Sequence, residues 1–189
     1  MKKSSRKLAK FSSRELRWDF YPMFLRLMEA GFETEAMLFI LSTWNFARFR
    51  YAIRSFDLDH FQKVLKTLEP PFDKLKKENF KTINFDKYKE DIGKIFISLS
   101  LIKGIEKTGA PKLMHLKIPE VFVMWDSFIR NYYGFKKGDG EDYFAFLKLM
   151  QEKFKNAKIN QGRTLAKSID EHNYKTITEK ILRRKSLKQ

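Results

Sequence analysis

The chain has 189 residues, enough for one domain with a sizeable hydrophobic core. With 43% hydrophobic and 15% aromatic residues, it has the composition of a globular rather than a disordered protein. The absence of Cys excludes disulfides, a thiolate nucleophile and Cys-ligated zinc or iron–sulfur sites. His60, His115 and His172 are too scattered to indicate a metal site, and we expect no metal and no cofactor.

The net charge of +16 is concentrated at the two ends of the chain. Residues 1–10 carry five basic side chains and no acid, and residues 173–189 carry six basic side chains and one acid. We therefore expect a flexible basic arm over residues 1–12, a single helical domain over residues 13–172 and a basic tail over residues 173–189. Such ends attract phosphate or an anionic surface, although basic termini can also serve solubility alone.

The location expected for the protein is cytoplasmic. No apolar run reaches the length of about 18 residues that spans a bilayer, and the basic N-terminus lacks the apolar core of a signal peptide. Abundant Lys, Glu, Ile and Phe without Cys also fit a thermophilic protein.

The hydrophobic spacing along the chain predicts helices throughout. The spacing of Ser12 and Glu15 indicates a capping box for a first helix, with a kink or a restart at Pro22 and an end at Gly31. A largely apolar helix follows from Thr34. Asp57 or Asp59 is expected to cap a third helix, DHFQKVLKTLE, which the Pro-Pro pair stops. Further helices are expected over 72–79, from Asn84 or Phe85 to residue 103, and over 110–117, 126–133, 141–155 and 163–170, with a basic helix at the end of the chain.

The fold class predicted from these elements is all-α, a compact orthogonal array of seven to nine helices. The best strand candidate, Ile118–Met124, is short and isolated. Gly104, just past the helix expected over 84–103, has the position of a left-handed helix cap.

The segment from Leu101 to Gly134 concentrates Gly, Lys, His, Trp and Asp more tightly than any other part of the chain. It contains LIKGIEKTGA and then VMWDSFIRNYYGF. This order resembles the helix–hairpin–helix DNA glycosylase superfamily, where a hairpin reading roughly Leu-Pro-Gly-Val-Gly-x-Lys-Thr-Ala precedes an apolar-Val-Asp that heads a helix with an Arg. Lys107 precedes Asp126 by 19 residues, which suits the superfamily. KLMHLKIPEVFVMWD also looks like a motif of uncharacterised bacterial and archaeal proteins: Lys-x-x-His, then Pro, then Phe-x-x-Trp-Asp.

Two features depart from the glycosylase pattern. Glu106 stands where the second hairpin glycine is expected, and Lys112, 14 residues before Asp126, is a rival for the role of the lysine. The resemblance covers residues 101–135, with a helical remainder that is compatible with it.

The resemblance implies a base-excision enzyme with a central helix–hairpin–helix-like unit. A damaged nucleotide would rotate out of duplex DNA, a lysine amine would attack the sugar C1′, and a carboxylate would stabilise the charge that develops on the sugar. The implied catalytic pair is Lys107 and Asp126. The implied nucleic-acid contacts are Gly104, Thr108, Lys112 and Arg130, and the base-stacking candidates are Trp44 and Trp125.

Structural roles can account for the same residues. Asp126, followed by Ser127, has the position of a helix N-cap, and tryptophans are more often buried in a core than used as stacking platforms. His115 lies among apolar residues, as a hydrogen-bonded core histidine would.

Three functions therefore remain open. The first is a DNA glycosylase, with or without lyase activity, acting on damaged duplex DNA. The second is a non-catalytic nucleic-acid-binding helical protein, and the third is a helical interaction module whose basic charge is incidental. The common phosphate-loop, dinucleotide, zinc-protease and serine-hydrolase motifs are missing from the chain.

Overall fold

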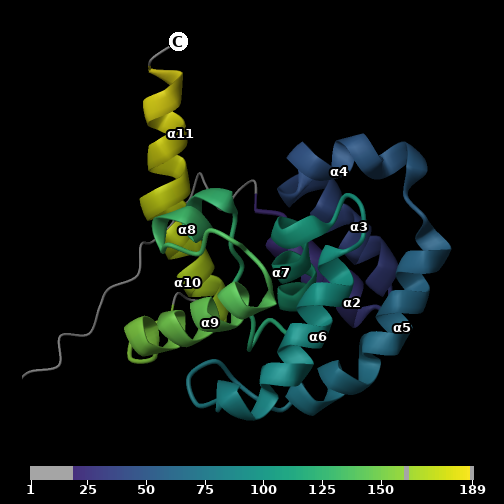
Figure 1. The fold of residues 1–189 in the computed structure, drawn as a ribbon, viewed down its shortest axis with the longest axis horizontal. Coiled ribbons are helices and arrows are strands. Elements are labelled where there is room, and N and C mark those ends of the chain that lie inside the picture. The colour runs from purple at the N-terminus through teal and green to yellow at the C-terminus, as the bar shows by residue number, and fades with distance from the viewer. Residues whose placement is uncertain (1–18, 160–161, 188–189) are drawn as a thin grey trace, which may run out of the picture.

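The computed structural model describes residues 19–159 and 162–187, and all secondary structure in these ranges is helical (Figure 1). The elements are α2 (Tyr21–Glu29), α3 (Glu33–Trp44), α4 (Phe46–Ala52), η1 (Ile53–Ser55), α5 (Leu58–Leu75), η2 (Phe85–Tyr88), α6 (Lys89–Ser100), α7 (Glu106–Lys117), α8 (Ser127–Tyr132), α9 (Gly140–Phe154), α10 (Leu165–Asn173), η3 (Tyr174–Thr178) and α11 (Glu179–Ser186). Since α10, η3 and α11 form one continuous helix, the described ranges hold nine helices, which confirms the all-α prediction.

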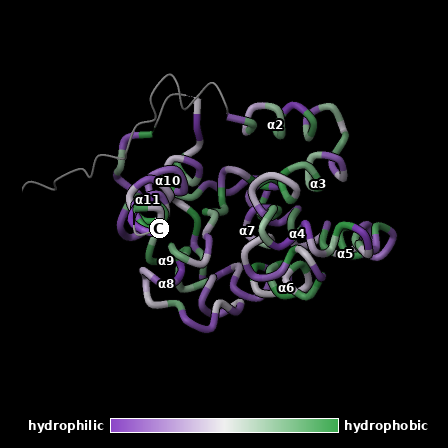
Figure 2. Tube along the Cα trace, turned by 90° about the horizontal axis from the view of Figure 1, so that it is seen from above, coloured by the Kyte–Doolittle hydropathy of each residue, from purple (hydrophilic) through white to green (hydrophobic). Residues whose placement is uncertain are grey.

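Helix α7 lies at the centre of the molecule. In two perpendicular views it stands between α2–α5 on one side and α8–α11 on the other (Figures 1 and 2), and it packs against α2, α3 and α6. Every residue from Gly109 to Leu116 is buried. A helix that is buried all round belongs to the core of the fold, so the other helices are arranged around this one.

The stop expected at Pro70 and Pro71 was wrong, because α5 continues through both prolines to Leu75. Its buried stripe begins at Phe61 and extends past the prolines to Phe72 and Leu75, with Pro71 itself buried. This continuous apolar face packs against α6. Burial of the stripe outweighs the hydrogen bonds that two prolines remove from the helix.

Helix α7 begins at Glu106, earlier than the expected start at residue 110, and contains Pro111. Proline has no backbone N–H, so the carbonyl of Lys107, four residues earlier, receives no helical hydrogen bond from position 111. The indole Nε1 of Trp125 donates to this carbonyl at 2.9 Å. The proline thus frees an acceptor through which the segment before α8 is attached to the central helix.

The segment Val121–Trp125 follows a turn and is buried throughout, but it forms neither a helix nor a strand with any other described residue. Side chains from the core satisfy its backbone carbonyls instead. His115 Nδ1 lies 2.6 Å from the carbonyl oxygen of Phe122, and the Tyr143 hydroxyl donates to that of Val123 at 3.1 Å. The strand candidate is therefore a buried connection in which core side chains pair with the carbonyls of Phe122 and Val123.

The turn between α6 and α7 has an unusual backbone. Gly104 has φ 91° and Glu106 has φ 53°, and Glu106 is the only described residue other than glycine with a positive φ. The buried amide of Asn45 donates to the carbonyls of Gly104 and Ile105 at 2.8 and 3.2 Å. A Cβ at Gly104 would lie 2.5 Å from the Cβ of Ala52, so this turn is packed closely against α4.

Two other expectations concern the ends of the chain. The arm over residues 1–12 and the capping box at Ser12 lie outside the described residues. The boundary expected between residues 172 and 173 falls inside the continuous helix α10–η3–α11, where Ile177 and Thr178 are buried. None of the described helices is both long enough and apolar enough to cross a membrane.

Replacement of Gly104 by Ala should destabilise the fold more than replacement of Gly134 by Ala. Both glycines have a positive φ, of 91° and 87°, but only the Cβ at position 104 meets other atoms. We expect a loss of about 1–2 kcal/mol for Gly134→Ala and about 2–5 kcal/mol for Gly104→Ala, measured by urea unfolding. Equal losses would show that contact with Ala52 is unimportant.

The hydrogen bond between Trp125 and the Lys107 carbonyl can be measured with a double-mutant cycle. Trp125→Phe removes the donor and should cost about 2–4 kcal/mol in the free energy of unfolding. In a Pro111→Ala background the restored N–H can take the same carbonyl, so Trp125→Phe should cost about 1 kcal/mol less there. Identical costs in both backgrounds would mean that the proline does not supply the acceptor.

Candidate functional site

A cavity of about 580 Å³ lies between the C-terminal end of α3, the central helix α7, the start of α8 and the helix α10–η3–α11. Its volume falls in the range of small-molecule sites. The lining residues are Asp19, Thr43, Trp44, Lys112, Met124, Trp125, Asp126, Ile129, Arg163, Lys167, Asp170, Glu171, Tyr174 and Glu179.

Lys112 is the lysine that α7 brings to the cavity. Its side chain is buried and its amine donates to the backbone carbonyl of Thr108 at 3.0 Å. Burial lowers the pKa of the Lys112 amine to about 8, and the carboxylates of Asp126 and Asp170 oppose this shift. An amine with this pKa is neutral in an appreciable fraction of molecules near pH 7, as a nucleophilic amine must be.

Asp126 is held at both carboxylate oxygens. Its Oδ1 accepts the backbone N–H of Ile129 at 2.8 Å, which makes it the N-cap of α8 as the sequence indicates. Its Oδ2 accepts the hydroxyl of Thr178 at 2.6 Å. Thr178 ends the π-helical segment η3, so that segment helps to orient the carboxylate that α8 begins with.

The wall formed by α10 carries a buried network of charges. Lys167 Nζ lies 2.8 Å from an oxygen of Asp170 and 3.7 Å from an oxygen of Glu171. Arg163 pairs with Glu171 at 2.8 Å and also with Asp19. Burial raises the pKa of the Asp170 carboxyl, and Lys167 and Lys112 oppose that shift.

The aromatic side chains that line the cavity are Trp44, Trp125 and Tyr174, and they differ in solvent exposure. Trp125 is 1% exposed and is packed among the rings of Phe96, Phe135, Tyr143 and Phe146. The ammonium of Lys167 lies 4.5 Å from the centre of a Trp44 ring. Tyr174 is 45% exposed, so it has the most accessible aromatic ring of the lining.

The structure brings together Asp126, Lys112, Trp44 and Trp125 among the residues proposed from sequence. The remaining four lie elsewhere. Lys107 is exposed, and its amine donates to the carbonyl of Lys137 at 2.7 Å. It does not line the cavity, where α7 contributes Lys112 instead.

The proposed nucleic-acid contacts Gly104, Thr108 and Arg130 do not line the cavity either. Gly104 packs against α4, and the Thr108 hydroxyl donates to the side chain of Asn45 at 3.0 Å. The guanidinium of Arg130 lies against Gly138, and its Nε has no hydrogen-bond partner among the described residues.

Sequence reasoning did not identify the charged residues of α10 or Tyr174. A signal for the former exists in the spacing of Lys167, Asp170 and Glu171, which places opposite charges three and four residues apart on one helical face. Nothing in the sequence indicates that this face is buried. The sequence gives no sign that Tyr174 lines the cavity, because its position there depends on a π-helical turn.

No group of three or more His, Cys, Asp or Glu side chains in the described ranges is arranged to hold a metal ion. Comparison of the chain with protein families, with characterised proteins and with solved structures finds no match. The site must therefore be interpreted from its own geometry.

Replacement of Lys112 by Met should stabilise the protein near neutral pH. A pKa of about 8 against an ordinary 10.5 corresponds to a cost of about 3 kcal/mol for the buried charge. Between these two values the unfolded chain binds more protons than the folded chain, so stability rises with pH as that cost disappears. We expect Lys112→Met to raise the free energy of unfolding by about 1–3 kcal/mol below pH 8, with the gain disappearing toward pH 10.5.

The matched control is Lys107→Met, a lysine one and a half helical turns earlier whose side chain is exposed. It should change the stability by less than about 0.5 kcal/mol at every pH. Urea unfolding at pH 7 and pH 10 measures both variants. A gain for Lys112→Met that does not change with pH would assign the effect to packing rather than charge.

Proposed function

We propose that the chain is a DNA glycosylase with lyase activity in which Lys112 is the nucleophile and Asp126 is its carboxylate partner. The observation that carries the proposal is the convergence of a buried amine of lowered pKa, a fixed carboxylate and aromatic rings in one cavity. The resemblance of residues 101–135 to the helix–hairpin–helix superfamily supplies the reaction class.

The proposed chemistry needs an amine that can attack carbon. The neutral amine of Lys112 bonds to the sugar C1′ of an extruded nucleotide while the bond from C1′ to the base breaks, and the base leaves with the bonding electron pair. Loss of the amine protons and opening of the sugar ring give an imine, from which the strand can be cleaved. Burial of Lys112 supports this role because it favours the uncharged form.

Asp126 would stabilise the positive charge that develops on the sugar and assist removal of the amine protons. Its hydrogen bonds to Ile129 N–H and to Thr178 hold the carboxylate in place before the substrate arrives. Such preorganisation is what electrostatic stabilisation requires, since a mobile carboxylate would have to be reoriented during the reaction.

The turn between α6 and α7 supports a helix–hairpin–helix unit in the same proposal. The two residues with positive φ, Gly104 and Glu106, stand where that superfamily has its two hairpin glycines. The backbone N–H groups of Lys107 and Thr108, two residues that are not buried, have no acceptor among the described residues. These groups are available to a DNA phosphate, and Lys107 would contribute its charge beside them.

Borohydride trapping on duplex DNA with an abasic or damaged site tests the reaction. Reduction of the imine should leave a covalent protein–DNA adduct that Lys112→Ala abolishes and Lys107→Ala retains. The rate of adduct formation should rise with pH around the Lys112 pKa of about 8, because only the neutral amine attacks. Asp126→Asn should slow adduct formation about 100-fold or more.

The outcomes assign the nucleophile. An adduct that survives Lys112→Ala and is lost in Lys107→Ala would make Lys107 the nucleophile. DNA binding without any adduct would leave the non-catalytic nucleic-acid-binding protein, and no salt-sensitive DNA binding at all would leave the interaction module. Circular dichroism of each variant verifies that it is folded.

A further inference from the structure

Helix α4 and the turn η1 present large apolar side chains to solvent. Phe46, Tyr51 and Ile53 are 54%, 71% and 56% exposed. Arg50 orders two of them, since its guanidinium carbon lies 5.6 Å from the ring centre of Phe46 and 4.6 Å from that of Tyr51. It also donates to the Tyr51 hydroxyl at 2.6 Å, so the rings are held in a defined arrangement although they face water.

Cations surround these rings. The exposed basic side chains of α4, η1, the α6–α7 turn and the first turn of α7 are Arg48, Arg50, Arg54, Lys103 and Lys107. The only acid in these segments is Glu106, whose carboxylate lies 3.6 Å from Arg48. The close packing of Gly104 against Ala52 makes the two segments one surface. We call the exposed residues of 46–54 together with Lys103 and Lys107 the α4 surface.

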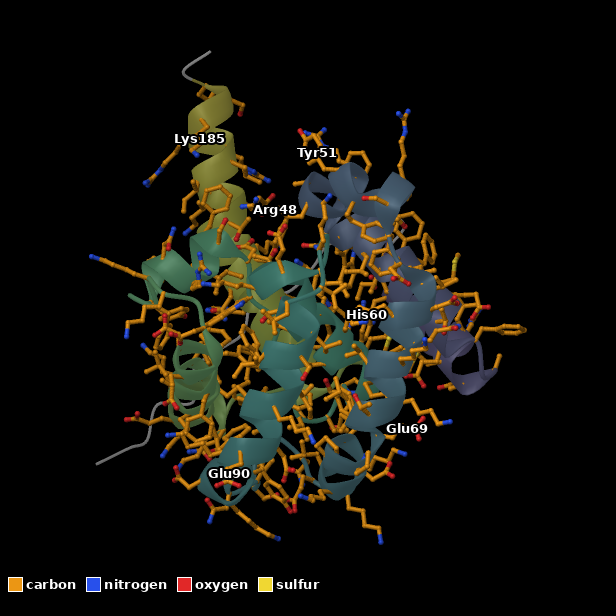
Figure 3. The ribbon with its side chains drawn as sticks, turned by 45° about the vertical axis from the view of Figure 1, so that its right-hand side comes forward. Arg48, Tyr51, His60, Glu69, Glu90 and Lys185 are labelled. Atoms are coloured by element: carbon orange, nitrogen blue, oxygen red, sulfur yellow. The ribbon has the colours of Figure 1, made fainter. Side chains whose placement is uncertain are left out.

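Two residues connect the α4 surface to the cavity. Trp44, which lines the cavity, ends α3 two residues before α4 begins. Lys107, on the other edge of the surface, offers its carbonyl to Trp125, which also lines the cavity. Figure 3 shows Tyr51 at the same end of the molecule as Lys185 of α11, with Arg48 at that end as well.

We infer that the α4 surface binds unstacked bases of opened DNA, with Tyr51 as the principal stacking residue. Exposed aromatic rings among cations match single-stranded nucleic acid, whose bases stack on the rings while its phosphates meet the charges. A second copy of the chain is disfavoured as the occupant, because two such surfaces would bring like charges together. The inference rests on the proposed function, since extrusion of a nucleotide opens the stack beside the cavity.

Fluorescence anisotropy with three labelled DNAs tests the inference: a single strand, a duplex with an uncleavable abasic analogue and a fully paired duplex. Tyr51→Ala should weaken binding to the first two about tenfold and to the paired duplex less than about twofold. Tyr51→Phe should bind like the unchanged protein because it keeps the ring. The matched control is Phe32→Ala, which removes another exposed ring, 52% exposed, at the opposite end of α3, and should bind all three DNAs normally.

Other results would overturn the inference, and they can be told apart from a failure of the proposed reaction. An equal loss on all three DNAs, or no loss, would overturn stacking by Tyr51. Self-association that sedimentation detects and Tyr51→Ala abolishes would make the surface a protein interface and overturn the inference. A Lys112-dependent adduct together with normal binding by Tyr51→Ala refutes this inference alone, whereas a selective Tyr51 effect without any adduct supports it and refutes only the proposed reaction.

Discussion

One hydrogen bond, from the Trp125 indole to the carbonyl of Lys107, determines how the rest of the site is assembled. The acceptor is free because Pro111 cannot donate to it. The bond attaches the segment Val121–Trp125 to α7, and the next residue, Asp126, is the N-cap of α8. A proline that weakens the central helix thereby places the carboxylate of one helix beside the lysine of another.

Lys112 is the residue in the buried part of α7 whose charge costs stability. Its neighbours from Gly109 to Leu116 are apolar apart from His115, whose two ring nitrogens are paired with Tyr21 and with the Phe122 carbonyl. Burial lowers the pKa of this histidine to about 3, so it stays neutral and contributes no charge to the core. The lysine, in contrast, retains a charge near neutral pH at a cost in stability, and such costs concentrate at functional sites.

Local signals in the sequence were sufficient for much of the fold. Helical periodicity predicted the all-α class, and the capping role of Asp126 and the left-handed Gly104 followed from residue type and position. The continuation of α5 through Pro70 and Pro71 could not be predicted, because it depends on the core that its apolar stripe meets.

The candidate site was less accessible from sequence. Spacing to Asp126 favoured Lys107, but the direction in which each lysine leaves α7 depends on where that helix begins and on what packs around it. The buried face of α10 is likewise a property of the assembled molecule, since Lys167 and Glu171 read as solvent-exposed residues when considered alone.

The π-helical segment η3 has a consequence for how the chain can tolerate insertions and deletions. Its wider turn holds one residue more than an α-helical turn, and it places Tyr174 in the cavity wall and Thr178 against Asp126. Deleting one residue between 174 and 178 would restore an ordinary α-helical turn and keep the residues after it on the same faces of the helix, because the wide turn already absorbs one extra residue. A one-residue deletion in the α-helical turns on either side would instead rotate everything after it by about 100° about the helix axis and turn the basic residues of α11 in another direction.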